Sequence, residues 1–107
     1  MGIKGDKGRD EGTLMAELLL EKFAIIPGIT KKKMFGGHGI FCNGKMFGMV
    51  DSKAHPYLKF NESNKALFEK YGAKFHSKMP YSSIPPEVMK DLDKLLEWAQ
   101  TSIAIQK

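Results

Sequence analysis

Apolar residues recur at helical spacing in two parts of the chain, residues 11–24 and residues 85–103. The first stripe consists of Leu14, Met15, Leu18, Leu19 and Phe23, and the second of Val88, Leu92, Leu95, Leu96, Ala99 and Ile103. This three-to-four-residue period is typical of amphipathic helices. Pro85 and Pro86 suit a first helical turn, and Asp91 is placed to cap a restart. Both segments are predicted to pack on a core.

Between these segments, two apolar runs within residues 38–51 flank Asn43-Gly44. Asn-Gly is the strongest short-range signal for a β-hairpin, because a type I′ turn needs positive φ at both central residues. A hairpin with this turn places Ile40 and Cys42 on the same face of their strand. We therefore expect one antiparallel strand pair at the centre of the fold.

The segment just before the hairpin combines a strand-like run with lysines and glycines. Residues 29–35 are predicted to form a strand, and Lys31, Lys32 and Lys33 suit an edge position in the sheet. Three glycines follow, at Gly36, Gly37 and Gly39. They are compatible with a bulge, a turn or a close approach of two backbones.

The chain after the hairpin continues with short elements. Residues 57–60 are predicted to form a strand, and a helix is expected from Asn61 or Ser63 to Tyr71. Residues 74–77 and 79–84 are predicted as two further short strands, the second at an edge of the sheet or outside it. The resulting fold class is α+β, with an antiparallel sheet, helices mainly on one face and the order α-β-β-β-(β)-α-β-(β)-α.

Length and composition favour a single domain. The chain has 107 residues, of which 1–10 are predicted to be a disordered tail and 11–107 one domain. Its longest apolar runs are far shorter than the roughly 20 residues of a membrane-spanning helix. Cys42 is the single cysteine, and the N-terminus lacks the apolar centre of a signal peptide. A cytoplasmic location is expected.

Charge and one aromatic residue supply the candidate binding residues. The net charge is +5, but Arg9 is the single arginine, and arginine is favoured for reading bases. The run Lys31, Lys32 and Lys33 has two interpretations: protection of an edge strand, or a basic lip for nucleic acid or an acidic partner. Trp98 lies off the apolar stripe of its helix and either caps the core or anchors a partner.

Residue types found in catalytic and metal-binding sites are present, but their spacing in the sequence does not fit such a site. His38 and Cys42 on one strand lie roughly 13 Å apart at 3.3 Å per residue, too far for a nucleophile and its base. His55 and His76 complete no zinc motif with them, and no cofactor or metal is expected. The glycine-rich stretch lacks the Gly-Lys-Ser/Thr ending of a phosphate-binding loop. We therefore expect no enzyme activity.

Several motifs resemble one known family. They are Pro27-Gly28-Ile29, Met34-Phe35-Gly36-Gly37, Asn43-Gly44-Lys45-Met46-Phe47, Tyr57-Leu58-Lys59, Met79-Pro80-Tyr81, Ile84-Pro85 and Leu95-Leu96-Glu97-Trp98-Ala99. Together they are similar to the N-terminal domain of the TfoX/Sxy competence regulators, over roughly residues 13–103. Phe35, Gly36, Gly37, Asn43 and Gly44 form the structural signature. The resemblance implies a two-layer fold similar to secretion-chaperone-like domains. Full-length regulators of this family also have a C-terminal helical domain, and the chain is expected to correspond to the N-terminal domain alone.

Two functional hypotheses follow. The resemblance implies a regulatory module that acts on competence genes together with a catabolite-activator-type transcription factor, and hence a protein partner from the transcription machinery. The dispersed positive charge offers an alternative, a weak nucleic-acid-binding domain that does not select sequence.

Overall fold

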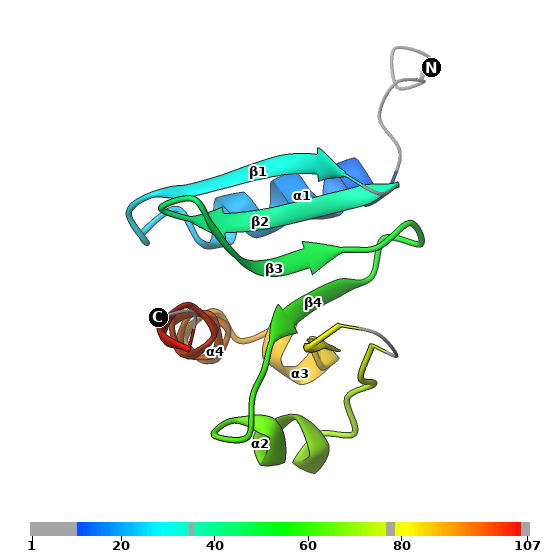
Figure 1. Ribbon diagram of the computed structural model, residues 1–107, viewed down its shortest axis with the longest axis vertical. Coiled ribbons are helices and arrows are strands. Elements are labelled where there is room, and N and C mark those ends of the chain that lie inside the picture. Colours follow the sequence, from blue (N-terminus) through cyan, green and yellow to red (C-terminus); the bar gives the residue numbers. More distant parts are fainter. Residues whose placement is uncertain (1–10, 35, 77–78, 106–107) are drawn as a thin grey trace.

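The computed structural model describes residues 11–34, 36–76 and 79–105, which form an open sheet and several helices (Figure 1). In chain order the elements are α1 (Glu11–Lys22), β1 (Ile29–Met34), β2 (Gly37–Cys42), β3 (Lys45–Val50), β4 (Pro56–Lys59), α2 (Lys65–Lys70), β5 (Tyr81–Ser83), α3 (Pro86–Met89) and α4 (Leu92–Ala104). The five strands are antiparallel, and their spatial order equals their order in the sequence. The predicted α+β fold with an antiparallel sheet is confirmed.

The Asn43-Gly44 hairpin forms as predicted. Asn43 has φ of 53° and Gly44 has φ of 84°, the two positive values that a type I′ turn requires. The register shifts between Ile40 and Phe41, so that Phe47 has no residue directly opposite it on β2. This bulge turns Phe47 into the core, where it is fully buried.

The lysine-bearing strand lies at an edge, as predicted. In the described part of the chain β1 pairs with β2 alone, with Met34 opposite Gly37. Gly36, at φ of 78°, turns the chain between the two strands, and a Cβ on Gly37 would overlap the carbonyl oxygen of Val50. The glycines therefore provide a turn and a close backbone approach. Phe35, part of the expected signature, lies outside the described residues.

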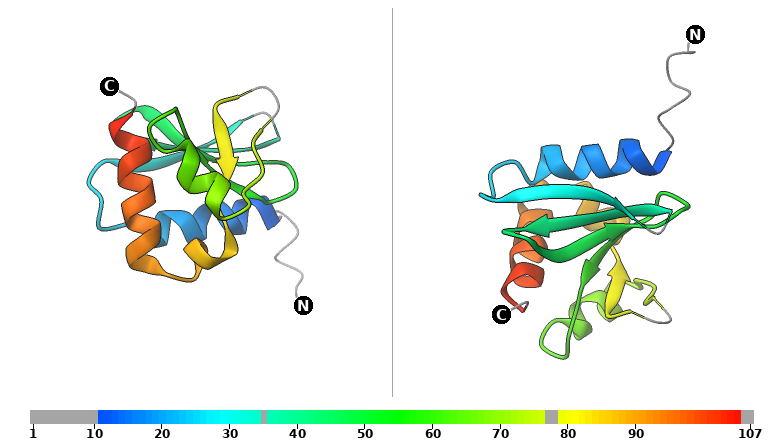
Figure 2. Two further views of the ribbon diagram at one scale, coloured as in Figure 1. Left: turned by 90° about the horizontal axis from the view of Figure 1, so that it is seen from below. Right: turned by 45° about the horizontal axis from the view of Figure 1, so that its top comes forward.

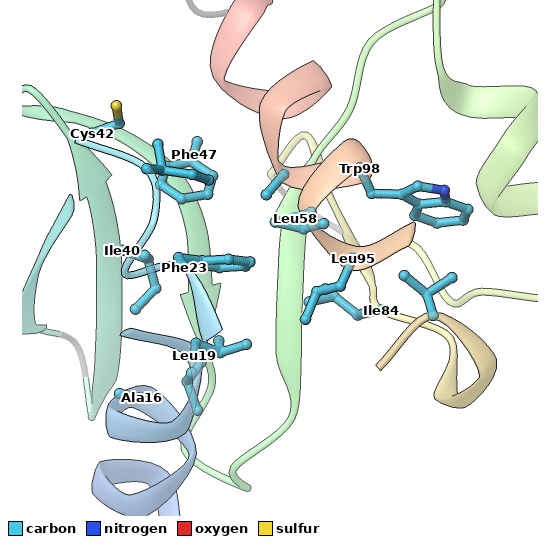
Figure 3. Close-up of a cluster of buried hydrophobic side chains, with 14 of the residues drawn as sticks. Ala16, Leu19, Phe23, Ile40, Cys42, Phe47, Leu58, Ile84, Leu95 and Trp98 are labelled. Atoms are coloured by element: carbon cyan, nitrogen blue, oxygen red, sulfur yellow. The ribbon is translucent and has the colours of Figure 1, made fainter. Parts of the chain in front are cut away.

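The core lies between the sheet and the helices. α1 contacts β1, β2 and β3, and α4 contacts β3 and β4, so that the two helices cover one face (Figures 1 and 2). Figure 3 shows the buried side chains that meet there, including Phe23, which directly follows α1, Phe47 of β3 and Leu95 of α4. The rings of Phe23 and Phe47 are 5.7 Å apart, and Cys42 is buried beside them.

The apolar stripes of α1 and α4 were only partly predicted. Leu14, Leu18 and Leu92, which the 3.6-residue period assigned to the core, are 51%, 38% and 47% exposed. The side chains that are buried instead are Ala16 on α1 and Trp98 and Ser102 on α4. On α4 the buried set is spaced three, four and seven residues from Leu95, so the contact face is rotated from the predicted one.

The end of the chain follows the predicted order with one difference. The restart that Asp91 was predicted to cap is confirmed, because the Asp91 side chain accepts a hydrogen bond from the Lys94 N–H (3.2 Å) at the start of α4. The predicted strand at residues 74–77 is reduced, in its described part, to an isolated bridge between Phe75 and Ser82 of β5, so the predicted pairing with residues 79–84 is present without a regular strand. Gly72, at φ of 74°, ends α2.

Two other expectations concern the chain as a whole. Within the described ranges no helix is long and apolar enough to cross a membrane. Residues 1–10, predicted as a disordered tail, lie outside the described residues.

Candidate functional site: a methionine-lined cavity beside a lysine-bearing edge strand

A cavity of about 370 Å³ lies on the sheet face turned away from α1 and α4. Its lining residues are Met34, Gly37, His38, Met46, Met49, Val50, Asp51, Ser52, His76 and Met79. Strand alternation explains the methionines: Met49 lies opposite Gly39 on one face, whereas its neighbour Val50 is buried on the other. Four of the chain's seven methionines therefore surround one hollow.

Glycines on β2 make room for these methionine side chains. Gly39 lies between β1 and β3, and a Cβ built on it would be 2.8 Å from the Met34 sulfur and 3.0 Å from the Met46 sulfur. The thioether groups of Met34 on β1 and Met46 on β3 therefore meet over Gly39, which has no side chain. Methionine is flexible and polarizable, and surfaces rich in it adapt to apolar partners of different shape.

Polar groups form one end of the cavity. The Asp51 carboxylate accepts hydrogen bonds from the backbone N–H groups of Lys53 (2.9 Å) and His55 (2.8 Å), which closes the turn after β3. The Tyr57 hydroxyl donates to the same carboxylate (3.2 Å). Burial, and secondly the charge of Asp51, raise the pKa of Tyr57 above its ordinary value. Because these interactions order the turn, they give Asp51 a structural role.

The lysine run borders this cavity through β1. Lys31, Lys32 and Lys33 are all exposed, as their edge position predicts. Lys32 and Met34 are two residues apart and lie on the cavity face, whereas Lys31 lies opposite the buried Ile40 and is directed to the helix side. The strand therefore presents positive charge on both sides of the sheet edge, next to an apolar hollow.

Trp98 lies in the core and not at this surface. Its side chain is 6% exposed and packs edge-on against Phe68, with ring centres 4.8 Å apart, and against Tyr71 at 5.4 Å. Of the two interpretations of Trp98, this burial favours the core residue over the partner anchor.

The residues considered for catalysis or metal binding do not assemble. Cys42 is buried, and its thiol donates to the Pro27 carbonyl (3.5 Å). His38 is a buried residue near the start of β2. His76 lies edge-on to Tyr57, with ring centres 6.0 Å apart. Among the described His, Cys, Asp and Glu residues, no group of three is placed to hold a metal ion.

Sequence reasoning missed the methionine cavity altogether. Its walls come from β1, β3 and the segment before β5, which are distant in sequence. A signal was nevertheless present: Met34, Met46 and Met49 occupy strand positions that alternate with core residues, and Gly37 and Gly39 lie between them.

A second hollow, of about 340 Å³, lies along α1. Its lining residues are Glu11, Leu14, Met15, Leu18 and Ala54. Its leucines, Leu14 and Leu18, are the residues of α1 whose exposure departs from the predicted apolar stripe.

Comparison with known proteins places this fold in a family. The model of the TfoX N-terminal domain matches residues 21–105, which is most of the chain. No curated protein matches the sequence. The chain belongs to the TfoX N-terminal domain family.

Proposed function

We propose that this chain is a non-enzymatic, cytoplasmic regulatory module that binds a protein partner across the methionine-lined cavity and the neighbouring lysine strand. The observation that carries the proposal is the pairing of an apolar hollow with a neighbouring edge strand whose three lysines are all exposed, with Lys32 on the cavity face. Family membership supports a regulatory role of the kind that competence regulators have. The partner would be a protein of the transcription machinery.

The composition of the surface favours a protein over nucleic acid. The cavity is lined mainly by apolar side chains, four of them methionines, and therefore suits an apolar side chain better than a phosphate group. Fully burying one large apolar side chain contributes about 1.5–3 kcal/mol, so one inserted side chain contributes a factor of roughly ten or more in affinity. The lysines then favour partners that carry acidic residues next to this apolar group.

The experiment compares matched polar substitutions on two surfaces. Met49→Gln keeps the length of the cavity side chain but makes it polar, and Leu92→Gln introduces the same polar group at an exposed site on α4. The partner is captured from cytoplasm with the parent protein, identified, purified and titrated against each variant. We expect Met49→Gln to weaken binding about tenfold, from the loss of roughly 1.4 kcal/mol, and Leu92→Gln to leave it unchanged. Equal affinities for the three proteins would contradict the proposal.

A second candidate function, weak nucleic-acid binding, is favoured by the three exposed lysines of β1. Such a strand neutralises about three phosphates, which predicts a logarithmic salt slope of about −3. Titration of duplex DNA at two salt concentrations tests this candidate. Tight, salt-resistant and sequence-selective DNA binding would favour it over the protein-partner proposal.

A further inference from the structure

The edge of β1 that faces away from β2 presents backbone hydrogen-bonding groups in a defined pattern. The Asn43 N–H donates to the Gly28 carbonyl at 2.9 Å, which fixes the phase of the β1–β2 ladder. Hydrogen-bonded and non-bonded pairs alternate along an antiparallel ladder. The N–H and C=O groups of Ile29, Lys31 and Lys33 are therefore directed away from β2, toward the open edge.

Nothing in the described part of the chain pairs with this edge, because β1 is the first strand of the sheet and its described neighbour is β2. An exposed edge of six residues is long enough to pair with another strand, about 20 Å at 3.3 Å per residue. Figure 1 shows β1 along the outer border of the sheet.

The side chains of β1 select the kind of strand that fits. In a pair formed by two copies of this edge, lysines would lie close to lysines, and like charges on adjacent strands are destabilising. An acidic segment places carboxylates against the same lysines. The charge pattern therefore disfavours a second copy of the chain and favours an acidic partner.

We propose that β1 binds an extended acidic segment of the partner protein as a sixth strand of the sheet. On the added strand, acidic residues next to Lys31 and Lys33 alternate with apolar residues next to Met34, which reach toward the methionine cavity. The inference rests on the proposed function and deepens it, since it names the conformation and the chemistry of the bound segment.

The probe is a fluorescent synthetic peptide of alternating glutamate and valine, titrated by anisotropy. Lys31→Pro removes one N–H that is directed to the open edge, so it leaves the ladder with β2 intact and blocks strand addition. Lys31→Ala removes the same charge but keeps the N–H. We expect Lys31→Ala to weaken peptide binding by less than tenfold and Lys31→Pro to weaken it by more than tenfold. Equal affinities of the two variants would contradict strand addition.

Modified peptides repeat the test without changing the protein. N-methylation of every second amide removes donors from one edge of the peptide only, so two such peptides exist, methylated on opposite edges. We expect one of them to lose binding and the other to bind like the parent peptide. Equal binding of both would contradict strand addition, as would equal binding of a lysine–valine peptide. Sedimentation of the protein alone should show a monomer, and a dimer disrupted by Lys31→Pro would assign the edge to a second copy.

The two proposals fail in different ways. If the captured partner binds the parent protein and loses affinity with Met49→Gln, but the glutamate–valine peptide does not bind, strand addition is wrong and the proposed function stands. If Met49→Gln has no effect on the partner, the proposed function fails whatever the peptide does.

Discussion

Replacing Trp98 by alanine tests whether this residue holds the core together or serves a partner. The indole is 6% exposed and contacts the rings of Phe68 and Tyr71, so the substitution removes buried area and both edge-on ring contacts. Truncation of a buried Trp to Ala costs about 3–5 kcal/mol. That is a large part of the roughly 5–15 kcal/mol that stabilises a domain.

The assay is thermal unfolding followed by circular dichroism. A loss of 1 kcal/mol shifts the melting temperature of a domain of this size by about 4 °C or more, so we expect Trp98→Ala to melt at least about 12 °C below the parent. Leu92→Ala on the same helix is the matched control, because Leu92 is 47% exposed, and its melting temperature should change far less. A parent-like melt for Trp98→Ala, together with loss of partner binding, would refute the core assignment.

Three further predictions concern the hairpin, the buried thiol and alkaline pH. Gly44→Val should lower the free energy of unfolding by about 1 kcal/mol or more through backbone strain alone, because φ is 84° and a Cβ there meets no atom within 4 Å. Lys45→Val is the control, and equal melting temperatures of the two variants would argue against a type I′ turn. The Cys42 thiol, 8% exposed, should react with a thiol reagent much more slowly in the native protein than in denaturant, and equal rates would show that it is accessible. Burial raises the pKa of Tyr81 from 10.0 to about 12, so the folded state holds this proton more tightly than the unfolded state, and the stability that comes from this difference is lost as pH rises from about 10 to about 12. Denaturant titrations should show a smaller loss of stability over that range for Tyr81→Phe than for the parent, and identical losses would show that Tyr81 is not the cause.

The elements that could be predicted from sequence are those specified by local backbone chemistry. Asn43-Gly44 dictates positive φ at two positions, and Asp91 caps a helix with its own side chain, whatever the rest of the fold does. The three lysines of β1 likewise exclude a central strand, because a buried ammonium group is costly.

The parts that could not be predicted depend on contacts between distant segments. On α4, Leu92 and Trp98 are both apolar, so the 3.6-residue period fits more than one rotation of the helix. Contact with Phe68 of α2 selects the rotation that buries Trp98. The candidate cavity depends equally on tertiary structure, since β1, β3 and the segment that contains Met79 meet there only after folding.

Site-specific photo-crosslinking tests the central claim most directly, because it reports which surface the partner covers. A photoreactive amino acid is placed at Met46 in the cavity, at Leu14 in the hollow along α1, or at Leu92 on α4. The account predicts that irradiation in native cytoplasm gives one dominant protein adduct from position 46 and that positions 14 and 92 give none of it. The same adduct from position 14 or 92, with none from position 46, would contradict the account.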